Sequence, residues 1–173
     1  MDLGISGKTA LVSASSAGLG FASALALAEA GCKTVISGRN EERLMHAASK
    51  IPNSIPVIAD VSTVKGSQAL VHDAKSELGT NIDILITNAG GPPTGTFAST
   101  DVDQYLTAIE LNLMSVVAMC KETVPDMQEK KMGKSTSDNL NICSATNSKY
   151  HAFKYSQSRS YRILKNHGTR NSS

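Results

Sequence analysis

A loop of small residues near the start of the chain has the composition needed to bind phosphate. It reads Ser13-Ala14-Ser15-Ser16-Ala17-Gly18-Leu19-Gly20 and separates an apolar run from a helical pattern. A loop that leaves a buried strand and opens a helix presents unpaired backbone N–H groups and the positive end of the helix dipole. Gly18 and Gly20 remove side chains where the backbone would approach a ligand and where the helix would meet the strand. The loop therefore predicts a phosphate site, and a plain tight turn is the alternative interpretation.

The elements that would position this loop alternate between short apolar runs and longer helical patterns. We expect strands at residues 9–12, 33–37, 55–59 and 82–87, with helices at 18–30, 40–49 and 63–78 between them. Nearly continuous apolar runs are typical of buried parallel strands. The order predicts an α/β fold, a Rossmann-like doubly wound parallel sheet of about four strands with flanking helices. Asn40 is expected to cap the second helix, and a further helix is expected over residues 102–130, interrupted near Pro125.

Further motifs follow the later elements. They are Asp60-Val61 after the third predicted strand, Asn88-Ala89-Gly90 after the fourth, and Asn112 in the helix beyond it. With the glycine loop, these motifs resemble the short-chain dehydrogenase/reductase family, and they are similar to its 3-oxoacyl-acyl-carrier-protein-reductase-like members. The loop resembles that family's Thr-Gly-xxx-Gly-x-Gly pattern, with Ser13 in place of the Thr and Ala14 in place of the first Gly. The resemblance implies that Asn112 supports a catalytic lysine through a water molecule.

The resemblance also implies a dinucleotide site. Its members would be Ser13, Ser15, Ser16, Gly18, Leu19, Gly20, Arg39, Asn40, Asp60, Val61, Asn88, Ala89 and Gly90, with the Asp60 side chain and the adjacent backbone holding the adenine ring. An acidic residue at the end of the second strand would bond ribose hydroxyls, whereas the guanidinium of Arg39 favours a 2′-phosphate, so we expect NADP(H). The alternatives are a solvated Arg39, an Asp60 that caps the helix starting at Thr63, and a buried structural Asn112.

The residues expected to complete the chemistry are not found at the family's spacing. Carbonyl reduction needs a proton donor, which the family supplies with a Tyr acidified by a Lys four residues later and a Ser about a dozen residues earlier. Ser144 is followed by Tyr150 with Lys154 and by Tyr161 with Lys165, and these tyrosines come 6 and 17 residues after the serine. Neither spacing fits, so we interpret both pairs as accidental. Asn112 is the one catalytic residue that the resemblance places.

The chain changes character after about residue 134. Residues 1–128 carry eight Lys and Arg against thirteen Asp and Glu, a net charge of −5, whereas residues 129–173 carry nine against two, a net charge of +7. We expect a partial Rossmann nucleotide-binding domain over residues 1–134 and an irregular, basic tail rich in Ser and Asn over residues 135–173. A shifted reading frame beyond about Lys134, which would truncate the fold, is the hypothesis that explains this change.

Composition excludes several classes of protein. The sequence has no run of 18 apolar residues and no basic or apolar leader, so we expect a cytoplasmic protein without a membrane span. Cys32, Cys120 and Cys143 lie far apart without metal-ligand spacing, so no metal site is expected and the cysteines are interpreted as buried free thiols.

Three functional hypotheses follow. The leading one is an NADP(H)-dependent short-chain oxidoreductase by descent, acting on a small-molecule carbonyl or alcohol, with this chain truncated and inactive. The second is a non-catalytic nucleotide-binding module. The third, ranked last, is nucleic-acid binding by the basic tail through phosphate contacts and stacking aromatic residues, and no specific nucleic acid is expected. The resemblance implies homo-oligomers in relatives, through helices that include residues 102–130, and leaves assembly of this chain open.

Overall fold

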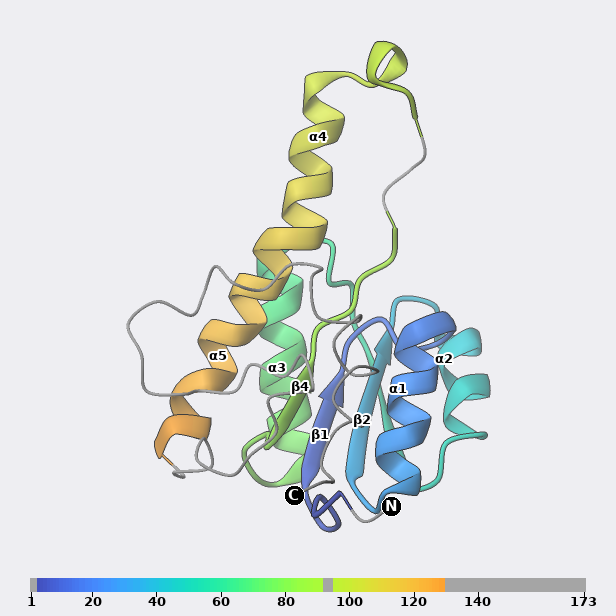
Figure 1. The fold of residues 1–173 in the computed structure, drawn as a ribbon, viewed down its shortest axis with the longest axis vertical. Coiled ribbons are helices and arrows are strands. Elements are labelled where there is room, and N and C mark those ends of the chain that lie inside the picture. Colours follow the sequence, from blue (N-terminus) through green and yellow to red (C-terminus); the bar gives the residue numbers. More distant parts are fainter. Residues whose placement is uncertain (1–2, 92–94, 130–173) are drawn as a thin grey trace, which may run out of the picture.

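The computed structural model describes residues 3–91 and 95–129, which form a parallel β-sheet with helices on both faces (Figure 1). Strands and helices alternate as β1 (Thr9–Val12), α1 (Gly18–Glu29), β2 (Lys33–Gly38), α2 (Glu41–Ala48), β3 (Ser54–Ile58), α3 (Val64–Leu78) and β4 (Ile84–Ile86). A 3₁₀ turn η1 (Phe97–Ser99), helix α4 (Val102–Ile109), a π-helical turn η2 (Glu110–Met114) and helix α5 (Ser115–Glu129) follow. The predicted boundary at residue 134 and the tail at 135–173 lie outside the described residues.

The strands lie in the order β3-β2-β1-β4 and all run parallel. Leu11 of β1 pairs with Val35 of β2 on one side and with Leu85 of β4 on the other. The chain thus builds outward from β1 in one direction and then returns to the other side of β1. Such a reversal opens a crevice beyond the carboxyl ends of the strands, where open α/β sheets bind their ligands. The predicted fold class, a Rossmann-like parallel sheet, is confirmed.

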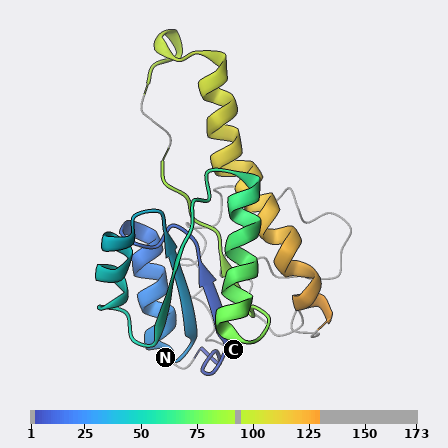
Figure 2. The ribbon, with the colours of Figure 1, turned by 180° about the vertical axis from the view of Figure 1, so that it is seen from behind.

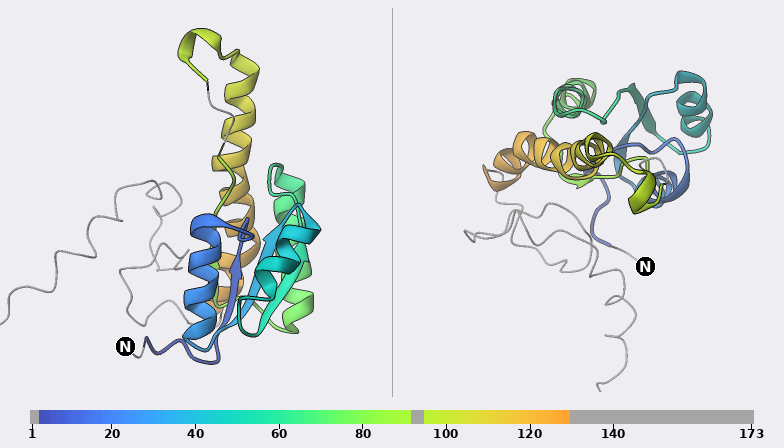
Figure 3. Two further views of the ribbon diagram at one scale, coloured as in Figure 1. Left: turned by 90° about the vertical axis from the view of Figure 1, so that its right-hand side faces the viewer. Right: turned by 90° about the horizontal axis from the view of Figure 1, so that it is seen from above.

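Both faces of the sheet are covered, which explains the unbroken apolar strands. Successive side chains of a strand point to opposite faces. Leu11 joins a core with α3 and α5, whereas Ala10 and Val12 join a second core with α1 and α2. Figure 3 shows α1 and α3 on opposite sides of the sheet, and the view from behind in Figure 2 brings α3 to the front.

Side-chain caps set where α2 and α3 begin. Asn40 Oδ1 accepts a hydrogen bond from the Arg43 N–H (2.8 Å), which confirms the predicted cap. Thr63 Oγ1 accepts one from the Gly66 N–H (3.0 Å), so α3 begins one residue later than the predicted start. Gly79 ends α3 with φ = 68°, a left-handed conformation that suits glycine.

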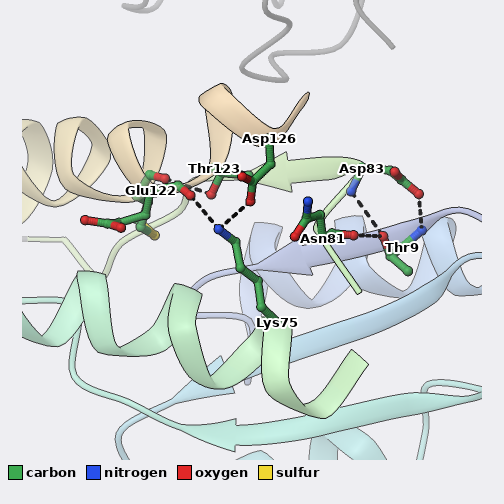
Figure 4. Close-up of polar contacts among 8 residues, drawn as sticks. Thr9, Lys75, Asn81, Asp83, Glu122, Thr123 and Asp126 are labelled. Carbon is green, nitrogen blue, oxygen red and sulfur yellow. Dashed lines mark hydrogen bonds and ion pairs between the residues drawn. The ribbon is translucent and has the colours of Figure 1, made fainter. Parts of the chain in front are cut away.

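Strand β4 is shorter than the predicted 82–87, and at both of its ends side-chain hydrogen bonds accompany the backbone hydrogen bonds to β1. At its start, the Thr9 N–H donates to the Asp83 carboxylate (3.0 Å) and the Asp83 N–H donates to the Thr9 hydroxyl (3.1 Å; Figure 4). At its end, the Asn88 N–H donates to Ser13 Oγ (2.8 Å). These side-chain contacts fasten β4 to β1 beyond the limits of the strand itself.

The predicted break near Pro125 is wrong, because α5 continues through this residue. Proline has no N–H to donate to the preceding turn. The helix is secured there from α3, since Lys75 Nζ donates to the Glu122 carbonyl (2.7 Å) and pairs with the Asp126 carboxylate (2.6 Å; Figure 4). The interruption of the predicted long helix lies instead at η2, where it widens into a π turn.

The cysteines do not share one state. Cys32 is a free, buried thiol, as predicted, and burial, followed by the nearby charge of Asp83, raises its pKa above the usual value. Cys120 is disulfide-bonded, so its interpretation as a free thiol is wrong. It is half-buried on α5 and packs against the core beside that helix. Cys143 lies outside the described residues.

Helix α4 extends away from the sheet (Figures 1 and 3). It contains no buried residue, and Val102, Leu106 and Ile109 are exposed along it. Within residues 3–91 and 95–129, no helix has the length and apolar character needed to cross a membrane.

The packing of α2 predicts opposite effects at two neighbouring positions. Leu44 is 0% exposed and Met45 is 53% exposed. We expect Leu44→Ala to lower the free energy of unfolding by about 2–5 kcal/mol, because it leaves a cavity in the core shared with α1. Met45→Ala should change it by less than about 0.5 kcal/mol. Urea unfolding followed by circular dichroism measures both, and equal effects would contradict the assignment of the buried face.

Candidate functional site

The predicted site residues gather at the carboxyl edge of the sheet. Because β1, β2, β3 and β4 are parallel, the segments that follow them all emerge at this edge, from which α4 projects (Figure 1). The loop 13–17 joins β1 to α1, and its end marks the start of α1, whose N-terminus faces the same edge. Motifs that are far apart in the sequence therefore lie at one edge of the sheet, where the strand order reverses between β1 and β4.

Reciprocal hydrogen bonds join the ends of β1 and β4. Ser13 Oγ donates to the Asn88 carbonyl (2.6 Å) and accepts from the Asn88 N–H (2.8 Å). The Asn88 side-chain amide donates in turn to the Ala14 carbonyl (2.9 Å). Ser13 is fully buried. The two predicted site residues Ser13 and Asn88 therefore come together, and their polar groups shape the loop instead of pointing outward.

A second set of hydrogen bonds joins the loop to β2. The Ser15 N–H donates to the Ser37 carbonyl (2.7 Å), and the Ser37 N–H donates to Ser15 Oγ (3.0 Å). Ser37 Oγ accepts from the Ala14 N–H (3.2 Å). Sequence reasoning did not assign Ser37 to the site, since β2 also contains Thr34 and a second buried hydroxyl did not distinguish the position. Ser15, like Ser13, uses its hydroxyl within the protein, since it also donates to the Val12 carbonyl (2.8 Å).

Gly20 is required by close approach. A Cβ at this position would lie 2.7 Å from both the Ala14 carbonyl oxygen and the Asn88 side-chain nitrogen. Gly18 has φ = +62°, a left-handed conformation, and a Cβ there would meet nothing within 4 Å. The first role of Gly20 is thus to let α1 approach the loop, whereas Gly18 leaves its backbone facing open space.

Arg39 and Asp60 follow neighbouring strands and are exposed. The Ser62 N–H donates to Asp60 Oδ1 (3.0 Å), and Thr63 provides the cap of α3, so the alternative that Asp60 is that cap is wrong. The backbone and side-chain hydrogen bonds from Ser62, and then the positive charge of Arg39, hold the pKa of Asp60 below its usual value. The charges of Arg39 and Asp60 thus influence each other across the ends of β2 and β3.

The remaining predicted residues divide into exposed and internal positions. Leu19, Gly90 and Asn40 are exposed, with Asn40 occupied as the cap of α2. Val61 is buried in the core with α3, which leaves its backbone as the group that can face the site. Ala89 is half-buried beside Asn88. Ser16 lies against Gly38, where a Cβ would come within 3.3 Å of the Ser16 hydroxyl.

Asn112 lies on η2, between α4 and α5. Its side-chain amide donates to the Ala108 carbonyl one turn earlier (2.9 Å), so it is bonded within its own helix. The residue is exposed, so the alternative of a buried structural amide is wrong. Ser144, Tyr150, Lys154, Tyr161 and Lys165 lie outside the described residues.

Comparison with known proteins agrees with this arrangement. The family profile described as short chain dehydrogenase matches residues 8–159. The chain belongs to the short-chain dehydrogenase family. Its relatives in this family include the uncharacterized oxidoreductase YvaG of Bacillus subtilis (strain 168), 32% identical over 140 residues that cover 78% of this chain and 51% of the relative. Oxidoreductase BOA17 of Botryotinia fuckeliana (strain B05.10) is 31% identical, with 73% and 46% covered.

Solved structures also match about three quarters of this chain. L-sorbose reductase from Gluconobacter frateurii, complexed with NADPH and L-sorbose, has a TM-score of 0.70 and 33% identity, covering 75% of this chain and 51% of its own. A 7α-hydroxysteroid dehydrogenase complexed with NADH and 7-oxo glycochenodeoxycholic acid has a TM-score of 0.68 and 28% identity, covering 73% and 50%. This short-chain dehydrogenase spans about half the length of the relatives it matches.

The close approach at Gly20 predicts a cost that outweighs helix propensity. Alanine is favoured over glycine in a helix by about 1 kcal/mol. The methyl of Gly20→Ala would nevertheless displace the Ala14 carbonyl and the Asn88 amide, so we expect a net loss of about 1–3 kcal/mol in the free energy of unfolding.

The matched control is Gly91→Ala, because a Cβ at Gly91 meets nothing within 4 Å. We expect it to change the free energy of unfolding by less than about 0.5 kcal/mol. Urea unfolding of both variants provides the comparison. A Gly20→Ala protein as stable as the unsubstituted chain would show that the loop does not press against α1.

Proposed function

We propose that residues 1–134 bind NADP(H) at the carboxyl edge of the sheet and serve an oxidoreductase that interconverts a small-molecule carbonyl and an alcohol. The observation that carries the proposal is the loop at the strand reversal, fixed by Ser13 and Asn88 and closed on α1 through Gly20. Residues 135–173 are proposed to be a separate basic segment. A helix N-terminus behind such a loop favours phosphate, because its N–H groups and its dipole both attract negative charge.

The residues present fit a dinucleotide. An added Cβ at Gly18 or Gly90 would meet nothing within 4 Å, so the backbone at both positions borders open space that a pyrophosphate and its sugars can occupy. Asp60 is an exposed carboxylate whose pKa is lowered by hydrogen bonds from Ser62, and its oxygens can accept hydrogen bonds from an adenine amino group. Bound there, the nicotinamide would supply the hydride, and the residues described here would bind and orient it.

Arg39 supports NADP(H) over NAD(H). Its guanidinium is exposed at the end of β2, where a 2′-phosphate would receive charge-assisted hydrogen bonds. The structural neighbours include one protein complexed with NADPH and another complexed with NADH, so the preference proposed for this chain depends on Arg39.

A nucleotide-binding module without turnover is the second candidate, favoured by the spacing of Tyr150 and Tyr161 from Ser144, which does not match the family's proton donor. The two candidates differ in one measurement. Oxidation of NADPH at 340 nm in the presence of a panel of small ketones, aldehydes and sugars would support the oxidoreductase, whereas cofactor binding without oxidation would support the module. If the protein bound neither NADPH nor NADH, both candidate functions would be contradicted.

The proposed 2′-phosphate contact predicts a selective loss of affinity. We expect Arg39→Ala to raise the Kd for NADPH about 10- to 100-fold, because a hydrogen bond to a charged group contributes about 1.5–3 kcal/mol. The Kd for NADH should change by less than about twofold, since that cofactor has no 2′-phosphate. Isothermal titration calorimetry measures both constants.

The control for this prediction is Lys50→Ala, which removes one positive charge at the other end of α2 and should leave both constants unchanged. An equal loss for NADPH and NADH in Arg39→Ala would assign Arg39 a structural role instead of a phosphate contact.

A further inference from the structure

Ala14 has a backbone conformation that its side chain disfavours. Its φ is +46°, in the left-handed region where residues with a Cβ are strained. Its methyl packs against the core shared by β1, α3 and α5 and so lies on the inner side of the loop. The chain therefore holds a strained residue at the first turn of the proposed nucleotide loop, and some contact must stabilise it there.

Side chains from other elements hold both polar groups of the Ala14 backbone. The Ala14 N–H donates to Ser37 Oγ (3.2 Å), and the Ala14 carbonyl accepts from the Asn88 side-chain amide (2.9 Å). Gly20 approaches the same carbonyl from α1. The peptide groups on either side of Ala14 are thus oriented by β2 and by the segment after β4.

Ser37 is itself held firmly. It is 1% exposed, and its N–H and carbonyl both bond to Ser15, at 3.0 and 2.7 Å. A hydroxyl inside a buried strand is costly unless it is hydrogen-bonded, and this one has the Ala14 N–H as a donor. Ser37 precedes Gly38, the last residue of β2, so the loop is bonded to the carboxyl end of an interior strand.

We propose that Ser37 is a positioning residue for the nucleotide loop: its hydroxyl holds Ala14 in the left-handed conformation and so sets the direction of the N–H groups that lead into α1. The inference rests on the proposed cofactor site for its functional consequence. It also makes a distinctive demand, because glycine adopts a positive φ without strain. With glycine at position 14, the Ser37 hydroxyl should no longer be needed to keep the loop in shape.

The test is a double-mutant cycle of Ser37→Ala and Ala14→Gly, with the urea midpoint and the Kd for NADPH measured for each protein. We expect Ser37→Ala alone to lower the midpoint and to raise the Kd roughly tenfold, the effect of one hydrogen bond of about 1.4 kcal/mol. Ala14→Gly alone should bind NADPH nearly as well as the unsubstituted chain. The double variant should recover most of the lost affinity, which a purely structural role for Ser37 would not produce.

Ser54→Ala is the matched control. Ser54 begins β3, at the edge of the sheet opposite the loop, and its hydroxyl donates to the Ile51 carbonyl (3.0 Å). This variant should lower the urea midpoint and leave the Kd for NADPH within about twofold. Loss of NADPH affinity in Ser54→Ala equal to that in Ser37→Ala would overturn the proposal.

The remaining outcomes also decide the matter. Ser37→Ala is compared in two proteins, one with Ala14 and one carrying Ala14→Gly. An equal loss of NADPH affinity in both would show that the two residues are not coupled and would overturn the proposal. If Ser37→Ala does not fold, folding of the double variant supports the coupling and failure of both contradicts it. If no protein binds NADPH or NADH, the proposed function fails, and the midpoints still decide whether Ser37 holds Ala14.

Discussion

The reciprocal hydrogen bonds between Ser13 and Asn88 are the constraint on which the rest of the candidate site depends. They join the ends of β1 and β4 where the strand order reverses. Because Asn88 also bonds to the Ala14 carbonyl, the same contact fixes the first turn of the loop. Helix α1 begins directly after this loop, and Gly20 lets the helix pack against the Ala14 carbonyl because it has no Cβ.

The buried polar groups of the loop are satisfied within the protein, which makes the loop rigid. Ser13, Ser15 and Ser37 each bond to backbone groups of the protein. Among the residues that the structure describes, every buried side-chain nitrogen and oxygen has a hydrogen-bond partner. A fully satisfied network of this kind favours one arrangement, because breaking any member leaves a buried group unpaired. Ala14 depends on this network, since its strained conformation is stable only while its neighbours hold it.

The two faces of the sheet contribute differently. The face covered by α1 and α2 packs through an apolar core. The face covered by α3 and α5 has an apolar core as well, and Lys75 of α3 adds polar contacts to α5. These contacts lie on either side of Pro125, through which α5 continues. The departure from α-helical geometry falls at η2, and there Asn112 is exposed and bonded within its own helix. The catalytic role that the family resemblance implies for Asn112 stays a prediction.

The sequence by itself determined the α/β order, the parallel sheet, the Asn40 cap and the family, because these follow from local periodicity and from motifs at fixed spacing. It could not determine that Ser13 and Asn88 exchange hydrogen bonds, that Ser37 bonds to the loop, or that α5 continues through Pro125. Those facts depend on residues distant in the sequence, such as Ser37 and Ala14 or Lys75 and Asp126. Only the tertiary structure places them side by side, because strand register and helix packing set such distances and neither is encoded in local spacing.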